Sequence, residues 1–375
     1  MTEIIKHRSL EEVKALSREA AVEIIRHAGI LGAGGGGFPT YVKHKDPQPH
    51  LIVNATESEP GYQADKMMHK EHLDEFLQLY EAMKAIFGFE QVSMCVHEED
   101  REWFADYQEH ADEGGLYDMR YLPNTYSSGE EKMLIRHATD TEVPWRVDTS
   151  EGNRRPGMPL DVGIIVNNSE TLFNVYNALF LGRPFVTKFL QVYGEEMDIK
   201  VYEVPLGSSV AEVLDFAGVD VENSGHLSCI DGGPYLHQMG IEELGAGDDA
   251  YVRSTTNALM LIQKGTKAYK EYADIKTEPP EEGIVTLVGL LSKGVDLPLG
   301  GRYLKPATPL VLEGDEVAYE QKIGEPVDEG LSVGVWASVG GTVTSIEDNI
   351  VSIAGGAVPM EDAEAEAEAE AKRQT

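Results

Sequence analysis

Apolar positions in the first half of the chain come in short runs and in helical spacings that alternate along the sequence. Residues 51–53 form an apolar run that predicts a buried strand, and residues 73–87 repeat apolar side chains at helical intervals. Further strands are predicted at residues 91–96 and 162–166, and a helix is predicted over residues 170–181. Strands that alternate with helices predict an α/β layer around a mainly parallel sheet.

An amphipathic helix is predicted ahead of the first strand. The segment Ser9-Leu10-Glu11-Glu12 has the spacing of a capping box at a helix N-terminus, and Gly29 is suited to end a helix. Four apolar residues recur at helical intervals between these two signals: Val13, Leu16, Ala20 and Ile24. One helix is therefore expected between Ser9 and Gly29.

The pattern changes near Lys200. Residues 201–207 predict a strand that enters a turn, and residues 209–216 predict a short helix. The segment Gly232-Gly233-Pro234 predicts a tight turn. Together they predict a compact βα unit of roughly sixty residues, which is small for a domain that folds without a neighbour.

The last part of the chain predicts short strands without helices. Residues 277–282 are rich in proline and acidic side chains and are interpreted as a linker. Beyond it, strands are predicted at residues 284–288, 318–319 and 341–343, with glycine turns between them. A small all-β module is expected there. The alanine–glutamate repeat over residues 361–370 is expected to be a disordered or weakly helical solvated tail.

The net charge narrows the classes of partner. Of 375 residues, 65 are acidic and 31 are basic, which leaves a formal net charge of −34. A field of this sign repels phosphate backbones and anionic membrane surfaces, so nucleic-acid binding is not expected. Because the acidic residues are spread along the chain, we expect a halophilic protein whose self-repulsion is screened by a high-salt cytosol.

The sequence predicts a cytoplasmic protein of two or three domains. No apolar run approaches the ~20 residues that a membrane-spanning helix needs, so membrane insertion is not expected. The first residues, Met1-Thr2-Glu3-Ile4-Ile5-Lys6, lack the basic-then-apolar order of a signal peptide.

The sequence predicts no metal site. Cys95 and Cys229 are the only two cysteines, and two thiols cannot supply the four ligands of an iron–sulfur cluster. Cys95 lies in a predicted strand and is expected to be an inert core thiol. His69 and His72 share a helical face with a lysine between them, and we expect both to be surface residues.

The most informative motif is the glycine-rich segment Gly32-Ala33-Gly34-Gly35-Gly36-Gly37-Phe38-Pro39. Consecutive glycines let the backbone approach a bulky ligand and direct several N–H groups to one side, which suits a phosphate. A helix and not a strand precedes it, so it does not fit the dinucleotide-binding G-x-G-x-x-G pattern. It also lacks the Gly-Lys-Ser/Thr ending of a P-loop. The alternative interpretation is a flexible loop.

Three further segments carry polar side chains that suit a ligand: two of them follow predicted strands, where α/β sheets hold ligands, and the middle one lies at a predicted helix start. They are Asn54-Ala55-Thr56-Glu57-Ser58-Glu59-Pro60-Gly61, Ser127-Ser128-Gly129-Glu130-Glu131-Lys132 and Val166-Asn167-Asn168. The amide of Asn54 has both a donor and an acceptor for a ring edge, and paired carboxylates suit a helix start. Taken singly, each segment has an alternative role as a cap or turn.

Together and in this order, these segments resemble the flavin-carrying, NADH-oxidising (51 kDa-type) subunit of respiratory complex I. They resemble the C subunit of the Rnf electron-transport complex more closely. The resemblance covers about residues 20–270. The segment Gly157-Met158-Pro159-Leu160-Asp161-Val162-Gly163 is closer to the Rnf type than to complex I.

The resemblance implies a role for each motif. The stretch from Gly29 to Lys43 matches the loop that cradles the flavin phosphate and faces the nicotinamide nucleotide. Glu59 and Glu131 are the implied catalytic residues, which orient the nicotinamide for hydride transfer. The implied cofactor-binding residues are Gly32, Gly34, Gly35, Gly36, Gly37, Phe38, Lys43, Asn54, Glu57, Gly129, Glu130, Asn167 and Asn168.

The resemblance also implies an order of domains. Residues 1–195 form an FMN/NADH-binding α/β domain with a Rossmann-like sheet, and residues 196–275 form a β-grasp (SLBB) module with a trailing helix. Residues 276–358 form a lipoyl-like barrel-sandwich module, which Rnf C subunits carry at their N-terminal end, and residues 359–375 form the acidic tail. No lysine lies in an attachment hairpin, so we expect no lipoylation or biotinylation.

The implied function is that of an FMN-dependent NAD(P)H dehydrogenase (diaphorase) that passes electrons from NADH through FMN to a partner. The partner would be an electron-accepting subunit with an iron–sulfur centre or a flavin. Two alternatives stay open: a non-catalytic nucleotide-binding scaffold subunit, and a corrinoid or flavin reductase. The sequence leaves the choice between NADH and NADPH open.

The chain departs from its relatives at four places. Ala33 stands where complex I commonly has an arginine, and Thr56 stands where it has an aspartate. The aromatic segment that grips the adenine is missing before Val166. No cysteine cluster follows Ser254-Thr255-Thr256-Asn257, a segment that resembles the one preceding the iron–sulfur cysteines of Rnf C subunits. We therefore expect no iron–sulfur cluster in this chain.

Overall fold

The computed structural model describes residues 6–56, 59–147, 154–194, 197–233, 238–240, 251–267 and 279–356. The chain divides into two compact units: unit 1 comprises residues 1–25 and 40–182, and unit 2 comprises residues 26–39 and 183–375. The glycine-rich segment therefore groups with the C-terminal half of the chain, although it precedes the first predicted strand.

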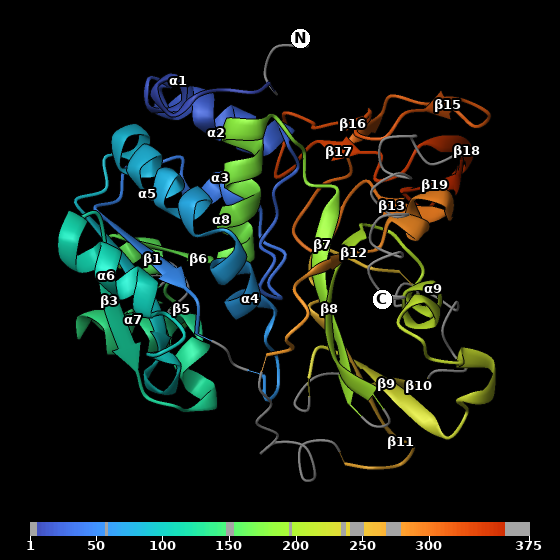
Figure 1. The fold of residues 1–375 in the computed structure, drawn as a ribbon. Helices are drawn as coiled ribbons and strands as arrows, with labels where there is room; N and C mark the ends of the chain where they lie inside the picture. The colour runs from blue at the N-terminus through green and yellow to red at the C-terminus, as the bar shows by residue number, and fades with distance from the viewer. Residues whose placement is uncertain are drawn as a thin grey trace. The chain divides into compact units, whose positions relative to one another are not determined.

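A four-stranded parallel sheet lies at the centre of unit 1 (Figure 1). Its order is β3-β2-β1-β6, and the strands are β1 (His50–Asn54), β2 (Gln91–His97), β3 (Asp118–Leu122) and β6 (Ile164–Asn168). The chain continues from β1 to β2 and β3 on one side, whereas β6 pairs with β1 on the other. The direction of winding thus reverses between β1 and β6.

Eight α-helices accompany this sheet in the described residues. They are α1 (Leu10–Lys14), α2 (Arg18–His27), α3 (Thr40–Lys43), α4 (Ala64–Glu71), α5 (Leu73–Phe87), α6 (Ala105–Gly114), α7 (Glu131–Thr139) and α8 (Ser169–Tyr176). Ile52, Cys95 and Ile164 point to one face of the sheet and share a buried cluster with Leu134 and Ile135 of α7. Helices α5 and α8 pack against each other.

The predicted elements of the first half are confirmed, with one correction. Helix α5 has the predicted bounds, and β1, β2 and β6 lie on the three predicted apolar runs. The capping box of Ser9 and Glu12 is also present. The single helix expected up to Gly29 is wrong, because α1 ends at Lys14 and α2 begins at Arg18. The Ser17 hydroxyl accepts a hydrogen bond from Ala20 N (3.2 Å) and so starts a second helix.

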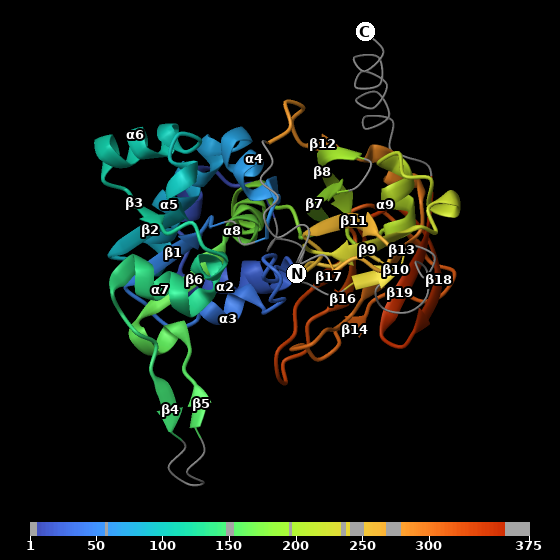
Figure 2. The same cartoon turned by 90° about the horizontal axis from the view of Figure 1, so that it is seen from below.

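A two-stranded antiparallel hairpin projects from the rest of unit 1 (Figure 2). Its strands are β4 (Trp145–Val147) and β5 (Arg154–Pro156). Trp145 is 64% exposed on this arm.

The largest sheet of unit 2 in the described residues is six-stranded and mixed, with the order β10-β9-β11-β7-β8-β12. The strands are β7 (Thr187–Gly194), β8 (Met197–Pro205), β9 (Leu227–Asp231), β10 (Gln238–Gly240), β11 (Ala258–Gln263) and β12 (Val285–Thr286). Helix α9 (Val210–Phe216) packs Val213 and Leu214 against Leu190 and Leu259 of this sheet. The predicted helix over residues 209–216 and the predicted strand from residue 201 are thereby confirmed.

The last part of unit 2 is β-rich, with short strands as predicted. The strand expected over residues 284–288 is limited to β12, because a 3-10 helix follows at Val288–Ser292. One sheet has the order β13-β19-β18-β15 and a second has the order β14-β16-β17. The strands are β13 (Val295–Pro298), β14 (Thr308–Pro309), β15 (Glu316–Val317), β16 (Lys322–Glu325), β17 (Val335–Trp336), β18 (Gly341–Glu347) and β19 (Ile350–Gly355). The strand expected at residues 318–319 is wrong, because Val317 and not Tyr319 enters the buried core.

The predicted domain boundaries stay a prediction. The six-stranded sheet takes β7 from before residue 195 and β12 from after residue 276, because both pair with β8. The acidic tail lies outside the described residues. Among the helices that the structure describes, none is both long and apolar enough to cross a membrane.

Candidate functional site

The polar side chains singled out in the sequence gather at the carboxyl ends of β1 and β6. The two strands pair in parallel register, with Asn54 opposite Asn168 and Val53 opposite Asn167. The winding of the sheet reverses between these strands, and in open α/β sheets ligands bind outside the carboxyl ends at such a reversal. The geometry therefore marks this edge of unit 1 as the candidate site.

Asn54 connects the end of β1 to the segment before α7. Its Nδ2 donates to the carbonyl oxygen of Gly129 (3.0 Å), and its Oδ1 accepts from the backbone N–H of Thr56 (3.1 Å). The amide thus holds two of the predicted motifs together. It is half-buried, and it uses both a donor and the acceptor within the protein.

The two asparagines at the end of β6 have different partners. Asn168 is the N-cap of α8, because its Oδ1 accepts from the backbone N–H groups of Glu170 (3.0 Å) and Thr171 (3.3 Å). Its Nδ2 donates to Asp65 of α4 (3.0 Å). The buried Asn167 donates from Nδ2 to His44 Nε2 (2.9 Å).

His44 is fully buried beside the aromatic rings of Phe87 and Phe89. Burial lowers the pKa of its imidazole to about 3, with a further contribution from the charge of Lys43. The ring is therefore neutral at neutral pH. Since Nε2 accepts from Asn167, Nδ1 carries the proton, and no partner for Nδ1 is present in the described residues.

Lys43 supplies a cation to this edge. Its Nζ donates to the carbonyl oxygen of Val166 (2.7 Å) and lies 3.4 Å from Glu131 Oε1. Glu131 is the first residue of α7, and its side chain is 39% exposed. The pair joins the end of α3, the middle of β6 and the start of α7, and leaves the carboxylate partly exposed to a ligand.

The other acidic residues divide into a cap and a loop residue. Glu130, not Glu131, caps α7, since its carboxylate accepts from the backbone N–H groups of Lys132 (3.2 Å) and Met133 (3.0 Å). Glu59 accepts a hydrogen bond from the hydroxyl of Tyr126 (2.6 Å). Glu57 lies outside the described residues.

The expectation that His69 is a surface residue is wrong. His69 is fully buried in α4 and stacks on Phe76. Its Nε2 lies 2.8 Å from Ser169 Oγ, which donates to the carbonyl oxygen of Asn54 (3.2 Å). His72 is half-buried. The available signal was the helical spacing from Asp65, because residues four apart on α4 face the consecutive residues Asn168 and Ser169.

Both ring nitrogens of His69 have a hydroxyl partner. Nε2 lies 2.8 Å from Ser169 Oγ, and Nδ1 lies 3.0 Å from the hydroxyl of Tyr107. The Tyr107 hydroxyl also donates to the backbone carbonyl oxygen of His69 (2.9 Å). Burial lowers the pKa of His69 to about 3, which keeps the ring neutral. His69 is not among the residues for which the sequence motifs predict a functional role.

The glycine-rich segment folds in unit 2 as a closed loop. Leu31 and Pro39 form an antiparallel bridge, the N–H of Gly32 donates to Phe38 O (2.9 Å) and the N–H of Gly37 donates to Gly32 O (3.1 Å). In the part of the chain that the structure describes, the N–H groups of residues 34–36 donate no hydrogen bond. Carbon atoms added as Cβ to Gly35 or Gly36 would meet no atom within 4 Å. The tip of the loop is thus open to a ligand.

The family comparisons agree with this geometry. Residues 25–177 match the Nuo51 FMN-binding domain, and residues 281–361 match the RnfC barrel sandwich hybrid domain. The first match begins just before the glycine-rich loop and contains every predicted site residue. The second covers the β-rich part of unit 2.

Three curated relatives with similar sequences are oxidoreductases or their subunits. The chain is 33% identical over 213 residues to the C subunit of the ion-translocating oxidoreductase complex of Pseudomonas aeruginosa, which is 56% of this chain and 26% of that protein. It is 30% identical over 228 residues to the C subunit of the proton-translocating ferredoxin:NAD(+) oxidoreductase complex of Clostridium ljungdahlii, which is 60% of this chain and 47% of that protein. It is also 28% identical over 243 residues to a cobalamin reductase of Citrobacter freundii, which is 64% of this chain and 49% of that protein.

The matches span less than half the length of these curated relatives. Among solved structures, an NAD+-reducing [NiFe]-hydrogenase in the H2-reduced state matches 69% of this chain and 49% of its own, with a TM-score of 0.54 and 20% identity. This likeness shows a shared fold. The chain thus matches the Nuo51 FMN-binding domain over residues 25–177 and the RnfC barrel sandwich hybrid domain over residues 281–361, and it is similar to the C subunits of ion-translocating oxidoreductases.

Proposed function

We propose that this chain is an FMN-dependent NAD(P)H dehydrogenase subunit that takes electrons from NADH and passes them to a partner electron carrier. The observation that carries the proposal is the register of Asn54 against Asn168 at the reversal of the sheet, inside a region that matches an FMN-binding domain. Relatives that act as subunits of electron-transfer complexes support the same class of function.

The glycine-rich loop fits the phosphate of FMN. Open space at Gly35 and Gly36 lets an anion reach the backbone, and the N–H groups of residues 34–36 are available as donors. The chain has a net charge of −34, and its carboxylates would repel a phosphate. Backbone N–H groups do not, so they suit an anion in this chain. We propose Gly32, Phe38 and the glycines between them as the phosphate cradle.

The edge of unit 1 supplies the polar contacts of a flavin and a nicotinamide. We propose that Asn167, Asn168 and Gly129 contribute hydrogen-bonding groups to the flavin, while Asn54 holds Gly129 in place. Lys43 pairs with Glu131 and limits the motion of its carboxylate. Glu59 and Glu131 then orient the nicotinamide, because hydride transfer needs the two rings in near contact.

The cofactor supplies the redox chemistry: bound FMN takes two electrons as a hydride and releases them one at a time. The protein contributes position and electrostatics. His44 and His69 are neutral and buried, so neither adds a positive charge behind the site at neutral pH. In the described residues no group of histidine, cysteine, aspartate and glutamate could hold a metal ion.

Flavin binding by glycine variants tests the proposal. Gly36 has open space at its Cβ position and an ordinary φ, so Gly36→Val places a side chain at the loop tip without backbone strain. We expect FMN affinity to fall at least tenfold while the melting temperature stays unchanged. Gly88→Ala, at a positive φ of 67° in the C-cap of α5, is the strained control that should lower stability and leave FMN affinity unchanged.

Two outcomes would contradict the proposed cradle. Unchanged FMN affinity in Gly36→Val would mean that the loop does not hold the phosphate. A purified chain that is colourless and binds no added FMN would favour the second candidate function, a non-catalytic scaffold subunit. The internal hydrogen bonds of Asn54 and Asn168 favour that candidate, since both amides already have structural roles.

The acceptor is a separate part of the proposal. We propose a protein partner that carries an iron–sulfur centre or a flavin, and the similarity to a cobalamin reductase makes a corrinoid the alternative acceptor. Anaerobic reduction of the FMN-loaded chain by NADH and by NADPH, followed by addition of a ferredoxin or cob(III)alamin, distinguishes the two. Reoxidation of the flavin only by the corrinoid would reject the protein acceptor.

A further inference from the structure

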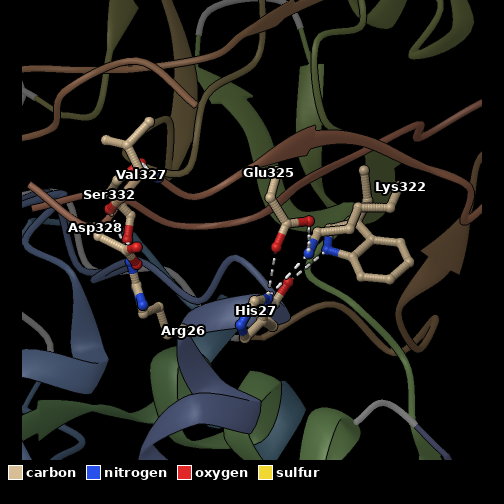
Figure 3. Close-up of polar contacts among 8 residues, drawn as sticks. Arg26, His27, Lys322, Glu325, Val327, Asp328 and Ser332 are labelled. Carbon is tan, nitrogen blue, oxygen red and sulfur yellow. Dashed lines mark hydrogen bonds and ion pairs between the residues drawn. The ribbon is translucent and has the colours of Figure 1, made fainter. Parts of the chain in front are cut away.

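The base of the glycine-rich loop is bound by the C-terminal β module, defined here as residues 281–356. Helix α2 ends just before the loop, and Arg26 in its last turn reaches into the module (Figure 3). Its guanidinium donates to the carbonyl oxygens of Val327 (2.7 Å) and Ser332 (3.3 Å). The Arg26 carbonyl in turn accepts from the N–H of Gly334 (3.0 Å). The module therefore holds Arg26 both by its side chain and by its backbone carbonyl.

His27 makes a second set of contacts with the same module (Figure 3). Its carbonyl oxygen accepts from Trp336 Nε1 (2.7 Å), and its Nδ1 accepts from Lys322 Nζ (2.9 Å). Lys322 also forms an ion pair with Glu325 (2.6 Å). The last carbonyls of a helix need partners, and here the β module supplies them.

Backbone contact at the loop base leaves no room for side chains. A Cβ on Gly29 would lie 2.5 Å from the Gly334 carbonyl oxygen, and a Cβ on Gly334 would lie 2.2 Å from the His27 carbonyl oxygen. Gly29 also has a φ of +82°, a conformation that glycine adopts without strain. The loop leaves the helix at a point where the module touches its backbone.

The far end of the loop is held as well. The ring of Phe38 meets Tyr303 of the β module edge-to-face, with centroids 5.7 Å apart. Tyr303 is 42% exposed, so this contact is at the surface. Between the two ends, the loop closes through the bridge of Leu31 and Pro39. The tip stays open while both ends are fastened.

We propose that the C-terminal β module is a positioning element that holds the glycine-rich loop in the shape that binds the FMN phosphate. The inference rests on the proposed function. A free loop of this composition loses much conformational entropy when it binds, because glycine has the most backbone freedom. Contacts that order the loop in advance remove that cost from binding. Arg26, Trp336 and Tyr303 are therefore positioning residues, although Tyr303 and Trp336 come more than 260 positions after the loop in sequence.

Four variants of the full chain test the role of each anchor. Trp336→Phe keeps an aromatic side chain but removes the hydrogen bond to His27 together with part of the indole, and Arg26→Gln removes the guanidinium that bonds to Val327 and Ser332. Tyr303→Ala removes the ring against Phe38, and Tyr303→Phe restores it. We expect Trp336→Phe and Arg26→Gln to weaken FMN binding about tenfold, which corresponds to about 1.4 kcal/mol. Tyr303→Phe should recover the affinity that Tyr303→Ala loses.

A matched control separates positioning from general stability. Thr344→Val removes one hydrogen bond to a backbone carbonyl, that of Ser352 (3.2 Å), in the same module but away from the loop. It should leave FMN affinity unchanged. Hydrogen–deuterium exchange of residues 29–39 without FMN adds a readout independent of the cofactor, and exchange should be faster in Trp336→Phe than in Thr344→Val.

The outcomes distinguish this inference from the proposed function. Equal FMN affinity and equal loop exchange in the unaltered chain, Trp336→Phe and Arg26→Gln would overturn the positioning role alone, even if the melting temperature falls. Absence of FMN binding by the unaltered chain would overturn the proposed function and this inference together. If Arg26→Gln does not fold, the conservative Trp336→Phe decides the question.

Discussion

Asn54 Nδ2 donates a hydrogen bond to the carbonyl oxygen of Gly129 over 3.0 Å, and so joins two segments that are 75 residues apart in sequence. Asn54 ends β1, and Gly129 ends the turn that leads into α7. The same amide accepts from Thr56 N. Because a single side chain holds both segments, the shape of this edge of the sheet depends on its donor.

Replacement of that donor should destabilise unit 1. Asn54→Asp keeps the acceptor for Thr56 but sets a carboxylate oxygen against the Gly129 carbonyl. We expect the free energy of unfolding to fall by about 1–3 kcal/mol, the cost of a half-buried polar group that loses its partner. Chemical denaturation at high salt measures it. Asn124→Asp is the control, because the described partner of that exposed amide is the N–H of Glu99, which bonds to Oδ1. Equal stability of both variants would refute the role given to Asn54.

Glu131→Gln should separate orientation from folding. Glu130 caps α7, so the helix start survives the substitution and the stability should change by less than about 0.5 kcal/mol. Loss of the charge that orients the nicotinamide should slow reduction of bound FMN by NADH by ~10–100-fold. Stopped-flow bleaching of the flavin measures this rate. Glu142→Gln removes another exposed carboxylate, one that pairs with Arg136 of α7, and should leave it unchanged. A lower melting temperature with an unchanged rate would make Glu131 a structural residue.

Acid should destabilise the fold through its buried histidines. The pKa values of His44 and His69 are lowered to about 3 by burial, whereas an unfolded histidine has a pKa of about 6.5. Between these values the unfolded state binds protons that the folded state excludes. The free energy of unfolding should therefore fall as the pH drops below about 6.5, by up to about 1.4 kcal/mol per pH unit for each histidine.

Denaturation between pH 5 and pH 7 measures this slope, above the range where most carboxylates titrate. His69→Gln removes one of the two groups and should flatten the curve by roughly 1.4 kcal/mol per pH unit. The slope and not the absolute stability is diagnostic, because the variant also loses contacts with Ser169 and Tyr107. An unchanged slope would mean that His69 is protonated in the folded state.

Both cysteines should be unreactive in the folded chain. Cys95 and Cys229 are fully buried, and burial raises the pKa of each thiol far above its usual range. A thiol-specific chromogenic reagent should label neither cysteine under native conditions and both after unfolding. Rapid labelling of the native chain would show that one of the two strands opens. Iron analysis of the same sample should find no stoichiometric iron, since two separated thiols cannot hold a cluster.

The local pattern of the sequence was enough to predict those helices and strands whose signals lie within a few residues of one another. The apolar face of α5, the capping box of Ser9 and the buried run of β1 are set by spacing along the chain. The apolar runs also placed Asn54 and Asn168 at the ends of predicted strands, and the structure shows that these two strands pair in parallel. The missed break between α1 and α2 was a competition between two local signals, in which the Ser17 cap prevailed.

The burial of His69 was decided by tertiary packing. Helical spacing identified its face, but only the packing of α4 against α8 places that face under the end of β6. The roles of Glu130 and Glu131 were likewise undecided in sequence. Both carboxylates stand at the same helix start, and backbone geometry one residue apart makes the first the cap and leaves the second beside Lys43.

The sequence by itself determined the chemistry of the glycine-rich loop: open backbone, available N–H groups and no side chains at the tip. Only the tertiary structure decided what holds it. Arg26, His27 and Phe38 find their partners in residues 303–336, and no local pattern encodes a pairing over that separation. The last carbonyls of α2 have no partner within the helix, so they are stabilised by donors from elsewhere in the chain. The tertiary structure places the donors of the β module, and the ring of Tyr303, next to them and to Phe38.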